Sequence, residues 1–217
     1  AQIFQSTEFS FDVLSQRLRE LSFLNAGIKI HIQDERSEKS HDFCYEGGIV
    51  SFVEHLNRSR QGLHQPPILM SGERKFESHG GSETPVSIEV ALQYNETYNE
   101  SVFSFANNIN TVEGGSHLIG FRTALTRALN RYLTAQKKTG KGEAESVSGD
   151  DVREGLTAVI SVKLPQPEFE GQTKTKLGNT EMRGFVQSAM MQGLAEYLEE
   201  HPKPARAIVS KSAQAAK

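Results

Sequence analysis

The sequence predicts an α+β domain in which helices and a sheet form a two-layer sandwich. Stretches in which apolar and polar residues alternate, typical of half-buried strands, are mixed with segments whose apolar residues recur every three or four positions, typical of amphipathic helices. Short hairpins and one strand–helix–strand crossover complete the pattern. No boundary clearly divides the 217 residues, so we expect one unit, although residues 1–80 could pack as a semi-independent hairpin with helices.

The N-terminal part carries the patterns of two helices, a hairpin and a further strand. Ser10 can cap the first helix and Gly27 can end it, because glycine adopts the left-handed conformation easily. Polar residues 34–40 form the turn of the hairpin. The apolar positions are Phe11, Leu14, Leu18 and Leu21 in the first helix, Ile28, Ile30 and Ile32 in one strand, Phe43 and Tyr45 in its partner, Ile49, Phe52, Val53 and Leu56 in a short helix after Gly48, and Ile68 to Met70 in the next strand, which could continue toward Phe76.

The middle of the chain predicts a strand pair and the longest helix. Residues 86–94 alternate cleanly, and 102–105 follow after a polar turn, so we expect an antiparallel pair. Two segments lack periodicity: 78–84 is expected to be a mobile surface loop and 134–147 a flexible linker. The long helix starts at Gly114-Gly115-Ser116, and its apolar stripe is Leu118, Phe121, Leu125, Leu129 and Tyr132.

The C-terminal part predicts a short helical turn, a buried strand and two helices. Asp150 and Asp151 lie at the start of the turn, where acids face the favourable end of the helix dipole. Pro202 and Pro204 separate the two helices, and the second spans 205–217. The strand has Leu156, Ala158, Ile160, Val162 and Leu164 inward, and the first helix has Met182, Phe185, Val186, Ala189, Met190, Leu194, Tyr197 and Leu198.

A stiff loop at 164–178 separates that strand from the helix that follows. Pro165 and Pro167 fix their own φ and push their predecessors toward extended geometry, whereas Gly171 frees the backbone. Three polar residues, Gln172-Thr173-Lys174, then form the tip. A short loop that presents a cation and an amide is suited to reach into a site on another domain.

Composition and motifs exclude several classes of protein. The net charge of −3 argues against a nucleic-acid binder that is basic overall, and no apolar run approaches the roughly 18 residues of a membrane helix. The single Cys44 cannot form an internal disulfide, which is consistent with a reducing compartment. His41 and Cys44 would point to opposite faces of a strand, so we expect no metal site. Neither common glycine-rich phosphate loop occurs.

Two groups of charged residues leave alternatives open. Asp150 and Asp151 could be catalytic, but we favour a helix N-terminus. On the long helix, Arg127, Arg131 and Lys138 fall within one arc opposite the apolar stripe, while Arg122 lies at its flank, near the interior. These cations are either a solvated face or a surface that meets DNA phosphates without reading sequence. We find no self-contained active site.

Five ordered blocks, at fitting distances over almost the whole length, are more specific than any single motif. The blocks are Arg17-Leu18-Arg19-Glu20-Leu21-Ser22-Phe23-Leu24-Asn25, Tyr45-Glu46-Gly47-Gly48-Ile49, Asn107-Asn108-Ile109 through Gly114-Gly115-Ser116-His117-Leu118-Ile119-Gly120-Phe121-Arg122, Gly149-Asp150-Asp151-Val152-Arg153-Glu154-Gly155-Leu156 and Gln172-Thr173-Lys174. With these blocks the chain resembles the transducer domain of the gyrase B family, within the type IIA DNA topoisomerases of the GHKL ATPase superfamily.

The resemblance implies a fold and a site. The fold is like domain 2 of ribosomal protein S5, with a left-handed strand–helix–strand crossover, which the usual rule would not predict. The transducer would span 1–217, with a core of about 1–199 and an outgoing helix at 202–217. Gln172 and Lys174 would contact the γ-phosphate of ATP in a neighbouring ATP-binding domain. Arg122 would link a cavity for transported DNA to the loop that carries Lys174, and Arg127 and Arg131 are further candidates to line that cavity.

The resemblance also implies the setting in which the chain works. The full-length protein uses ATP and Mg²⁺, with the metal bound outside this chain, and the chain alone would bind neither and be inactive. Expected partners are its own N-terminal ATPase domain, its TOPRIM domain, the gyrase A protein in a heterotetramer of two A and two B chains, and a transported DNA segment, in the cytoplasm and without a membrane. Because Ala1 is not methionine and Gln2-Ile3-Phe4 looks like a strand, we expect a piece of a longer protein.

Three other classes of protein share some of these sequence features. Topoisomerase IV shares most of the five blocks, and His117-Leu118 favours gyrase only weakly. A ribosomal or RNA-binding scaffold of the same fold is disfavoured by the acidity of the chain and by the lack of aromatic stacking platforms. A small-molecule kinase of related fold is disfavoured by the missing glycine-rich phosphate loop.

Overall fold

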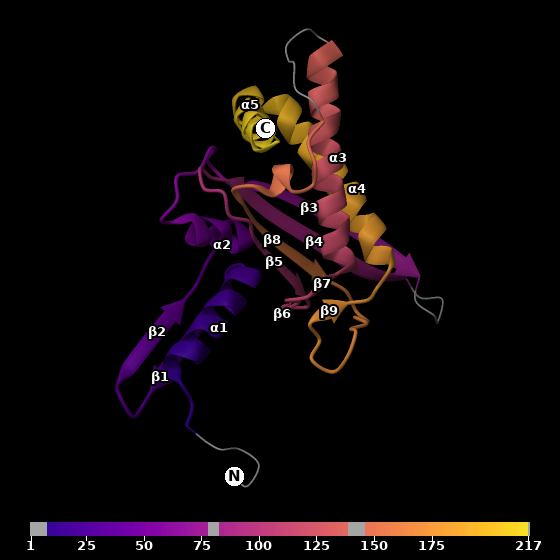
Figure 1. The fold of residues 1–217 in the computed structure, drawn as a ribbon. Helices are drawn as coiled ribbons and strands as arrows, with labels where there is room; N and C mark the ends of the chain where they lie inside the picture. The colour runs from indigo at the N-terminus through magenta and orange to yellow at the C-terminus, as the bar shows by residue number, and fades with distance from the viewer. Residues whose placement is uncertain (1–7, 78–82, 139–145, 217) are drawn as a thin grey trace. The chain divides into compact units, whose positions relative to one another are not determined.

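The computed structural model describes residues 8–77, 83–138 and 146–216 and divides the chain into two compact units (Figure 1). One unit ends at Phe52 and the other begins at Val53, so the expectation of a single unit does not hold. The division falls inside helix α2 (Gly48–Asn57), where no linker composition marks it. Most of the predicted loop at 78–84 and the centre of the predicted linker at 134–147 lie outside the described residues.

The first unit consists of a helix and a hairpin, as predicted. Helix α1 (Phe11–Leu24) is capped by Ser10, whose hydroxyl accepts a hydrogen bond from the amide of Val13 at 3.4 Å. Strands β1 (Ile30–Asp34) and β2 (Lys39–Phe43) pair antiparallel. The core of this unit forms around Phe23, whose ring stacks on those of Tyr45 and Phe52 at centroid distances of 3.8 and 4.8 Å.

The second unit contains a mixed five-stranded sheet in the order β3-β4-β8-β5-β6. Its strands are β3 (Ile68–Glu77), β4 (Glu83–Tyr94), β5 (Ser101–Ala106), β6 (Ile109–Asn110) and β8 (Leu156–Lys163). The predicted pairing of β4 with β5 is wrong. Strand β8 lies between them, antiparallel to β4 and parallel to β5. The polar turn at 95–100 reverses the chain without making the two strands neighbours, because turn chemistry specifies direction and not adjacency.

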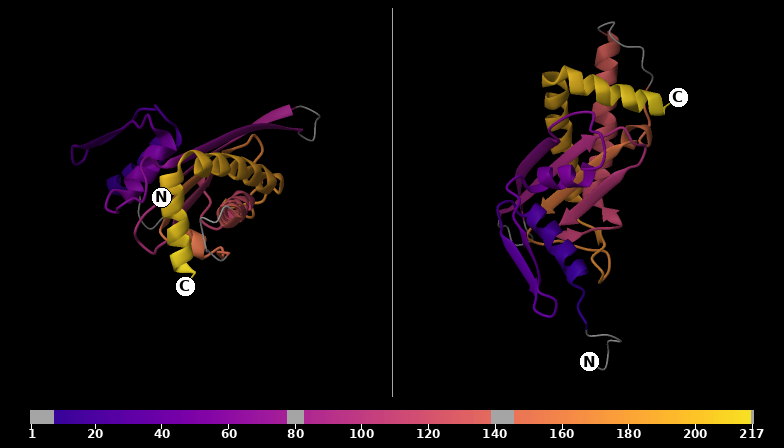
Figure 2. Two further views of the ribbon diagram at one scale, coloured as in Figure 1. Left: turned by 90° about the horizontal axis from the view of Figure 1, so that it is seen from above. Right: turned by 90° about the vertical axis from the view of Figure 1, so that its left-hand side faces the viewer.

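Helices cover one face of this sheet (Figures 1 and 2). Helix α3 (Ser116–Lys138) joins the parallel strands β5 and β8, which confirms the predicted crossover, and α4 (Glu181–Glu200) packs beside it. Helix α3 runs to Lys138, so residues 134–138 of the predicted linker are helical instead. Helix α5 (Pro202–Ala215) starts at Pro202, because proline is tolerated in the first helical turn. Fully buried side chains between the layers include Leu92, Phe121, Leu125, Ile160, Val186 and Met190.

A small parallel pair at one end of the sheet positions the predicted loop. Strand β7 (Gly114–Gly115) immediately precedes α3, and β9 (Lys176–Leu177) follows the loop. The 3-10 helix η1 (Asp151–Arg153) precedes β8 and confirms the predicted short helical turn. None of the described helices is both long and apolar enough to cross a membrane.

Candidate functional site

The loop between β8 and β9 is a hairpin held by hydrogen bonds between its two arms. The amide of Gly178 donates to the carbonyl of Glu168 at 2.7 Å, and the amide of Glu170 donates to the carbonyl of Lys176 at 2.9 Å. Asn179 closes the base, because its side-chain oxygen accepts from the amide of Glu168 at 2.8 Å. These contacts leave residues 171–175 as the tip, which is where the sequence placed it.

The tip exposes a cation that the described part of the chain does not neutralise. Gln172, Thr173 and Lys174 are all exposed. Lys174 makes no ion pair within the described residues, whereas Lys176, two residues on, pairs with Glu170 at 2.9 Å. Lys174 also has a φ of 55°, which is uncommon for a residue other than glycine. A bare ammonium beside an amide side chain on an anchored turn can bind an anion such as a phosphate.

The base of the loop is held tightly against β7. Gly114 pairs with Lys176, and Gly115 pairs with Leu177. A Cβ atom on Gly115 would lie 2.3 Å from the carbonyl oxygen of Leu177, and the φ of Gly115 is 134°. The sequence indicates only that the Gly-Gly pair starts a helix. The structure shows that Gly115 is also needed for close backbone packing, a use that local sequence patterns do not reveal.

Two hydrogen bonds that the sequence does not predict join Thr175 at the tip to Glu113, the residue before β7. The amide of Glu113 donates to the carbonyl of Thr175 at 3.0 Å, and the Thr175 hydroxyl donates to the Glu113 carboxylate at 2.5 Å. The two residues are 62 positions apart in the chain. The only sequence signal was the placement of Glu113 immediately before a Gly-Gly pair.

A buried polar cluster, which local sequence patterns do not reveal, includes residues on both sides of β7 in the chain. The hydroxyls of Ser104 and Thr111 are 2.7 Å apart, and Nε2 of His117 lies 3.1 Å from the Thr111 hydroxyl. Burial lowers the pKa of His117 to about 4, so this imidazole is neutral at pH 7. Its Nδ1 is buried without a hydrogen-bond partner among the described residues. The cluster fixes the segment that leads into α3.

The predicted cations on α3 fall into two groups. Arg122 forms an ion pair with Glu100 at 2.9 Å, and its side chain is 44% exposed, so its predicted place near the interior is wrong. Glu100 also pairs with Arg153 at 3.2 Å. Arg127 and Arg131 are exposed and have no ion pair within the described residues. The structure therefore does not bring Arg122 to the loop tip, and both interpretations of Arg127 and Arg131 stand.

The acids at η1 have structural partners. The Asp151 carboxylate accepts from the amide of Ser148 at 2.7 Å, and the amide of Asp151 donates to the Ser148 hydroxyl at 3.3 Å. Hydrogen bonds from Ser148 lower the pKa of Asp151. Asp150 pairs with Arg153. These reciprocal bonds are those of a helix start and support the structural interpretation over the catalytic one.

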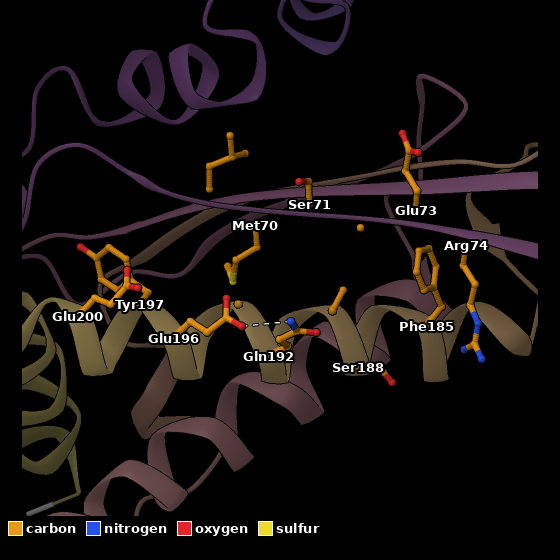
Figure 3. Close-up of a pocket in the computed structure, with 14 residues that line it drawn as sticks. Met70, Ser71, Glu73, Arg74, Phe185, Ser188, Gln192, Glu196, Tyr197 and Glu200 are labelled. Atoms are coloured by element: carbon orange, nitrogen blue, oxygen red, sulfur yellow. Dashed lines mark hydrogen bonds between the residues drawn. The ribbon is translucent and has the colours of Figure 1, made fainter.

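A shallow groove of about 580 Å³ lies between β3 and α4 (Figure 3). Met70 and Phe185 form its apolar floor, and Gln192 donates to Glu196 at 3.1 Å along its rim. No cluster of three potential metal-binding side chains occurs within the described ranges. The loop tip is thus the feature to which the sequence and the structure both point.

The fold matches about half of a solved gyrase B ATPase domain and about half of a solved topoisomerase IV ATP-binding domain. A 43K ATPase domain of Thermus thermophilus gyrase B, solved with an aminocoumarin, superposes with a TM-score of 0.81 at 37% identity, over 99% of this chain and 55% of that one. A topoisomerase IV ATP-binding domain of Francisella tularensis, solved with a small-molecule inhibitor, has a TM-score of 0.77 over 99% of this chain and 55% of that one. At 24% identity the second likeness shows the fold alone.

The chain belongs to the DNA gyrase B family, because the sequence profile of DNA gyrase B matches residues 48–217. It is also 53% identical, over 97% of its length, to the DNA gyrase B protein of Clostridium acetobutylicum. It spans 32% of that relative and about half of the solved ATPase domains.

Proposed function

We propose that this chain is the transducer part of a gyrase B protein, which completes the nucleotide site of an adjacent ATPase domain. Gln172 and Lys174 would contact the γ-phosphate of ATP held by that domain. The observation that carries the proposal is Lys174, an exposed cation at the tip of an anchored hairpin that has no ion pair among the described residues. Its neighbour Lys176 is neutralised within the loop, so only one of the two lysines is available to an external anion.

The residues of the tip fit a terminal phosphate. A Cβ atom built on Gly171 would meet nothing within 4 Å, so the backbone at the tip is open to a partner. Lys174 supplies a compact positive charge and Gln172 an amide donor, the groups that stabilise charge on phosphate oxygens. ATP, when bound with Mg²⁺ by the adjacent domain, supplies the phosphoryl group that the complete enzyme transfers to water. Lys174 would be the catalytic cation from this chain.

The wider setting of the proposal follows from the family. The complete protein is proposed to be an ATP-hydrolysing topoisomerase that couples hydrolysis to DNA strand passage and negative supercoiling. Its partners would be its own ATPase and TOPRIM domains, the gyrase A protein and a transported DNA segment near Arg122, Arg127 and Arg131. The likeness to domain 2 of ribosomal protein S5, with a left-handed β5–α3–β8 crossover, belongs to the same proposal.

Replacing Lys174 tests the proposal directly. In the full-length protein, Lys174→Gln should lower kcat for ATP hydrolysis by about a hundredfold or more, as expected when one electrostatic contact to the transition state is lost. Nucleotide affinity should fall much less, because adenine and ribose contacts would lie in the other domain. ATP-driven supercoiling should fail while ATP-independent relaxation persists.

Lys176→Gln is the matched control for this experiment. It removes the same charge two residues away, but from a lysine that already pairs with Glu170. We expect hydrolysis and supercoiling close to those of the unmodified protein. A Lys174→Gln variant that hydrolyses ATP and supercoils as well as this control would show that the loop does not sense the γ-phosphate.

A further inference from the structure

We infer that Glu113 is a positioning residue, which fixes the place of Lys174 relative to helix α3 by holding Thr175. The inference rests on the proposed function of Lys174 and adds how the tip is linked to the rest of the fold. Thr175 directly follows Lys174, and Glu113 is separated from the first residue of α3 only by Gly114 and Gly115. The contact between Glu113 and Thr175 therefore joins the tip to the start of the longest helix.

The contact consists of two hydrogen bonds that differ in kind. The backbone bond, from the Glu113 amide to the Thr175 carbonyl at 3.0 Å, continues the pairing of β7 with β9 by one residue. The side-chain bond, from the Thr175 hydroxyl to the Glu113 carboxylate at 2.5 Å, has a charged acceptor and is the stronger class of hydrogen bond. Removing the hydroxyl alone would leave the backbone bond in place, so the role of the side-chain bond can be tested separately.

The two ends of this contact are unequally fixed. On the side of Glu113, the amide of Gly114 donates to the carbonyl of Thr111 at 2.7 Å, and Thr111 belongs to the buried cluster with Ser104 and His117. On the other side, Gln172 to Lys174 are exposed. Glu113 is itself exposed, but its neighbour Gly114 is bonded to the buried cluster, whereas Gln172 to Lys174 have no such neighbour, so we expect Glu113 to set the position of the tip.

The ion pair next to the tip, between Lys176 and Glu170, cannot perform this role. The ion pair of Lys176 with Glu170 joins the two arms of the hairpin to each other and does not reach α3. The position of Glu113 thus reaches Lys174 through Thr175, in addition to the backbone pairing of β7 with β9. Helix α3 carries the exposed Arg127 and Arg131, so the contact connects the two surfaces assigned separate roles above.

Two substitutions at Thr175 isolate the hydroxyl in the full-length protein. Thr175→Val keeps the branched shape and removes the donor, whereas Thr175→Ser keeps the donor. Without nucleotide, we expect the amide of Glu113 to exchange hydrogen about tenfold faster in Thr175→Val than in the unmodified protein, because one bond to a charged acceptor is lost. Thr175→Ser and Lys176→Gln should leave this exchange nearly unchanged.

Kinetics separate positioning from folding. Thr175→Val should lower kcat for ATP hydrolysis by about tenfold with KM little changed, and Thr175→Ser should restore it. Glu113→Ala should have a similar effect, and combining it with Thr175→Val should add little further loss, because both remove the same bond. A general loss of folding would instead lower the melting temperature and affect Thr175→Ser as well.

The outcomes distinguish this inference from the proposed function. If Lys174→Gln abolishes hydrolysis while Thr175→Val matches Thr175→Ser in exchange and kcat, the positioning role of Glu113 is wrong and the role of Lys174 stands. If Lys174→Gln hydrolyses ATP normally, both are overturned. Additive losses for Glu113→Ala and Thr175→Val would also contradict the inference, since the two residues would then act independently.

Discussion

Replacing Gly115 with alanine should disrupt the anchor of the loop. Gly115 has a φ of 134°, and an added Cβ would lie 2.3, 2.5 and 2.9 Å from the carbonyl oxygen, amide nitrogen and Cα of Leu177. All three are backbone atoms of β9, so rotation of a side chain cannot relieve the contact. Either the pair β7–β9 opens or the backbone of Gly115 moves.

Two costs contribute to the effect of Gly115→Ala. A non-glycine residue in a rarely populated backbone region costs about 1–3 kcal/mol. Forcing extra volume into a packed site costs about another 1–3 kcal/mol. The sum, about 2–6 kcal/mol, is a large fraction of the about 5–15 kcal/mol by which domains are stable. We therefore expect a large drop in the free energy of unfolding.

Gly171→Ala is the matched control, measured beside Gly115→Ala by urea unfolding followed by circular dichroism. Gly171 also has a positive φ, 81°, but a Cβ there meets nothing within 4 Å. Gly171→Ala should therefore lower the free energy of unfolding only by the cost of backbone strain, about 1–2 kcal/mol. If the two variants lose the same free energy of unfolding within about 0.5 kcal/mol, close packing of Gly115 on Leu177 is not what holds the loop.

Two further predictions concern His117 and the cations of α3. The pKa of His117 is about 4 in the fold against 6.5 for an ordinary histidine, so the unfolded chain binds the extra proton and stability should fall as pH drops from about 6.5 to about 4, by up to about 3 kcal/mol. His117→Gln should flatten the pH dependence of the urea midpoint, and an unchanged slope would contradict the burial argument. In the full-length protein, Arg127→Gln and Arg131→Gln should each reduce the salt dependence of DNA affinity by about one unit of slope and weaken DNA stimulation of ATP hydrolysis. If neither the salt dependence nor the stimulation changes, Arg127 and Arg131 form only a solvated face.

Local patterns in the sequence were sufficient for most of the elements and for the loop tip. The cap at Ser10, the strand at 156–164 and the apolar stripe of α3 depend on residues within a few positions of one another. The tip was also local, because Gly171 and the polar residues after it are consecutive. The structure has each of these features where the sequence predicts it.

Which distant segments meet depends on the tertiary structure. The insertion of β8 between β4 and β5, the pairing of Arg122 with Glu100, and the bond between Glu113 and Thr175 all join residues far apart in the chain. Such contacts depend on which strands become neighbours, and the alternation of apolar residues is the same whichever neighbour a strand has. Local patterns therefore specify the helices, the longer strands and the exposed Lys174, whereas the short strands β6, β7 and β9 and the contacts that hold Lys174 in place depend on long-range packing.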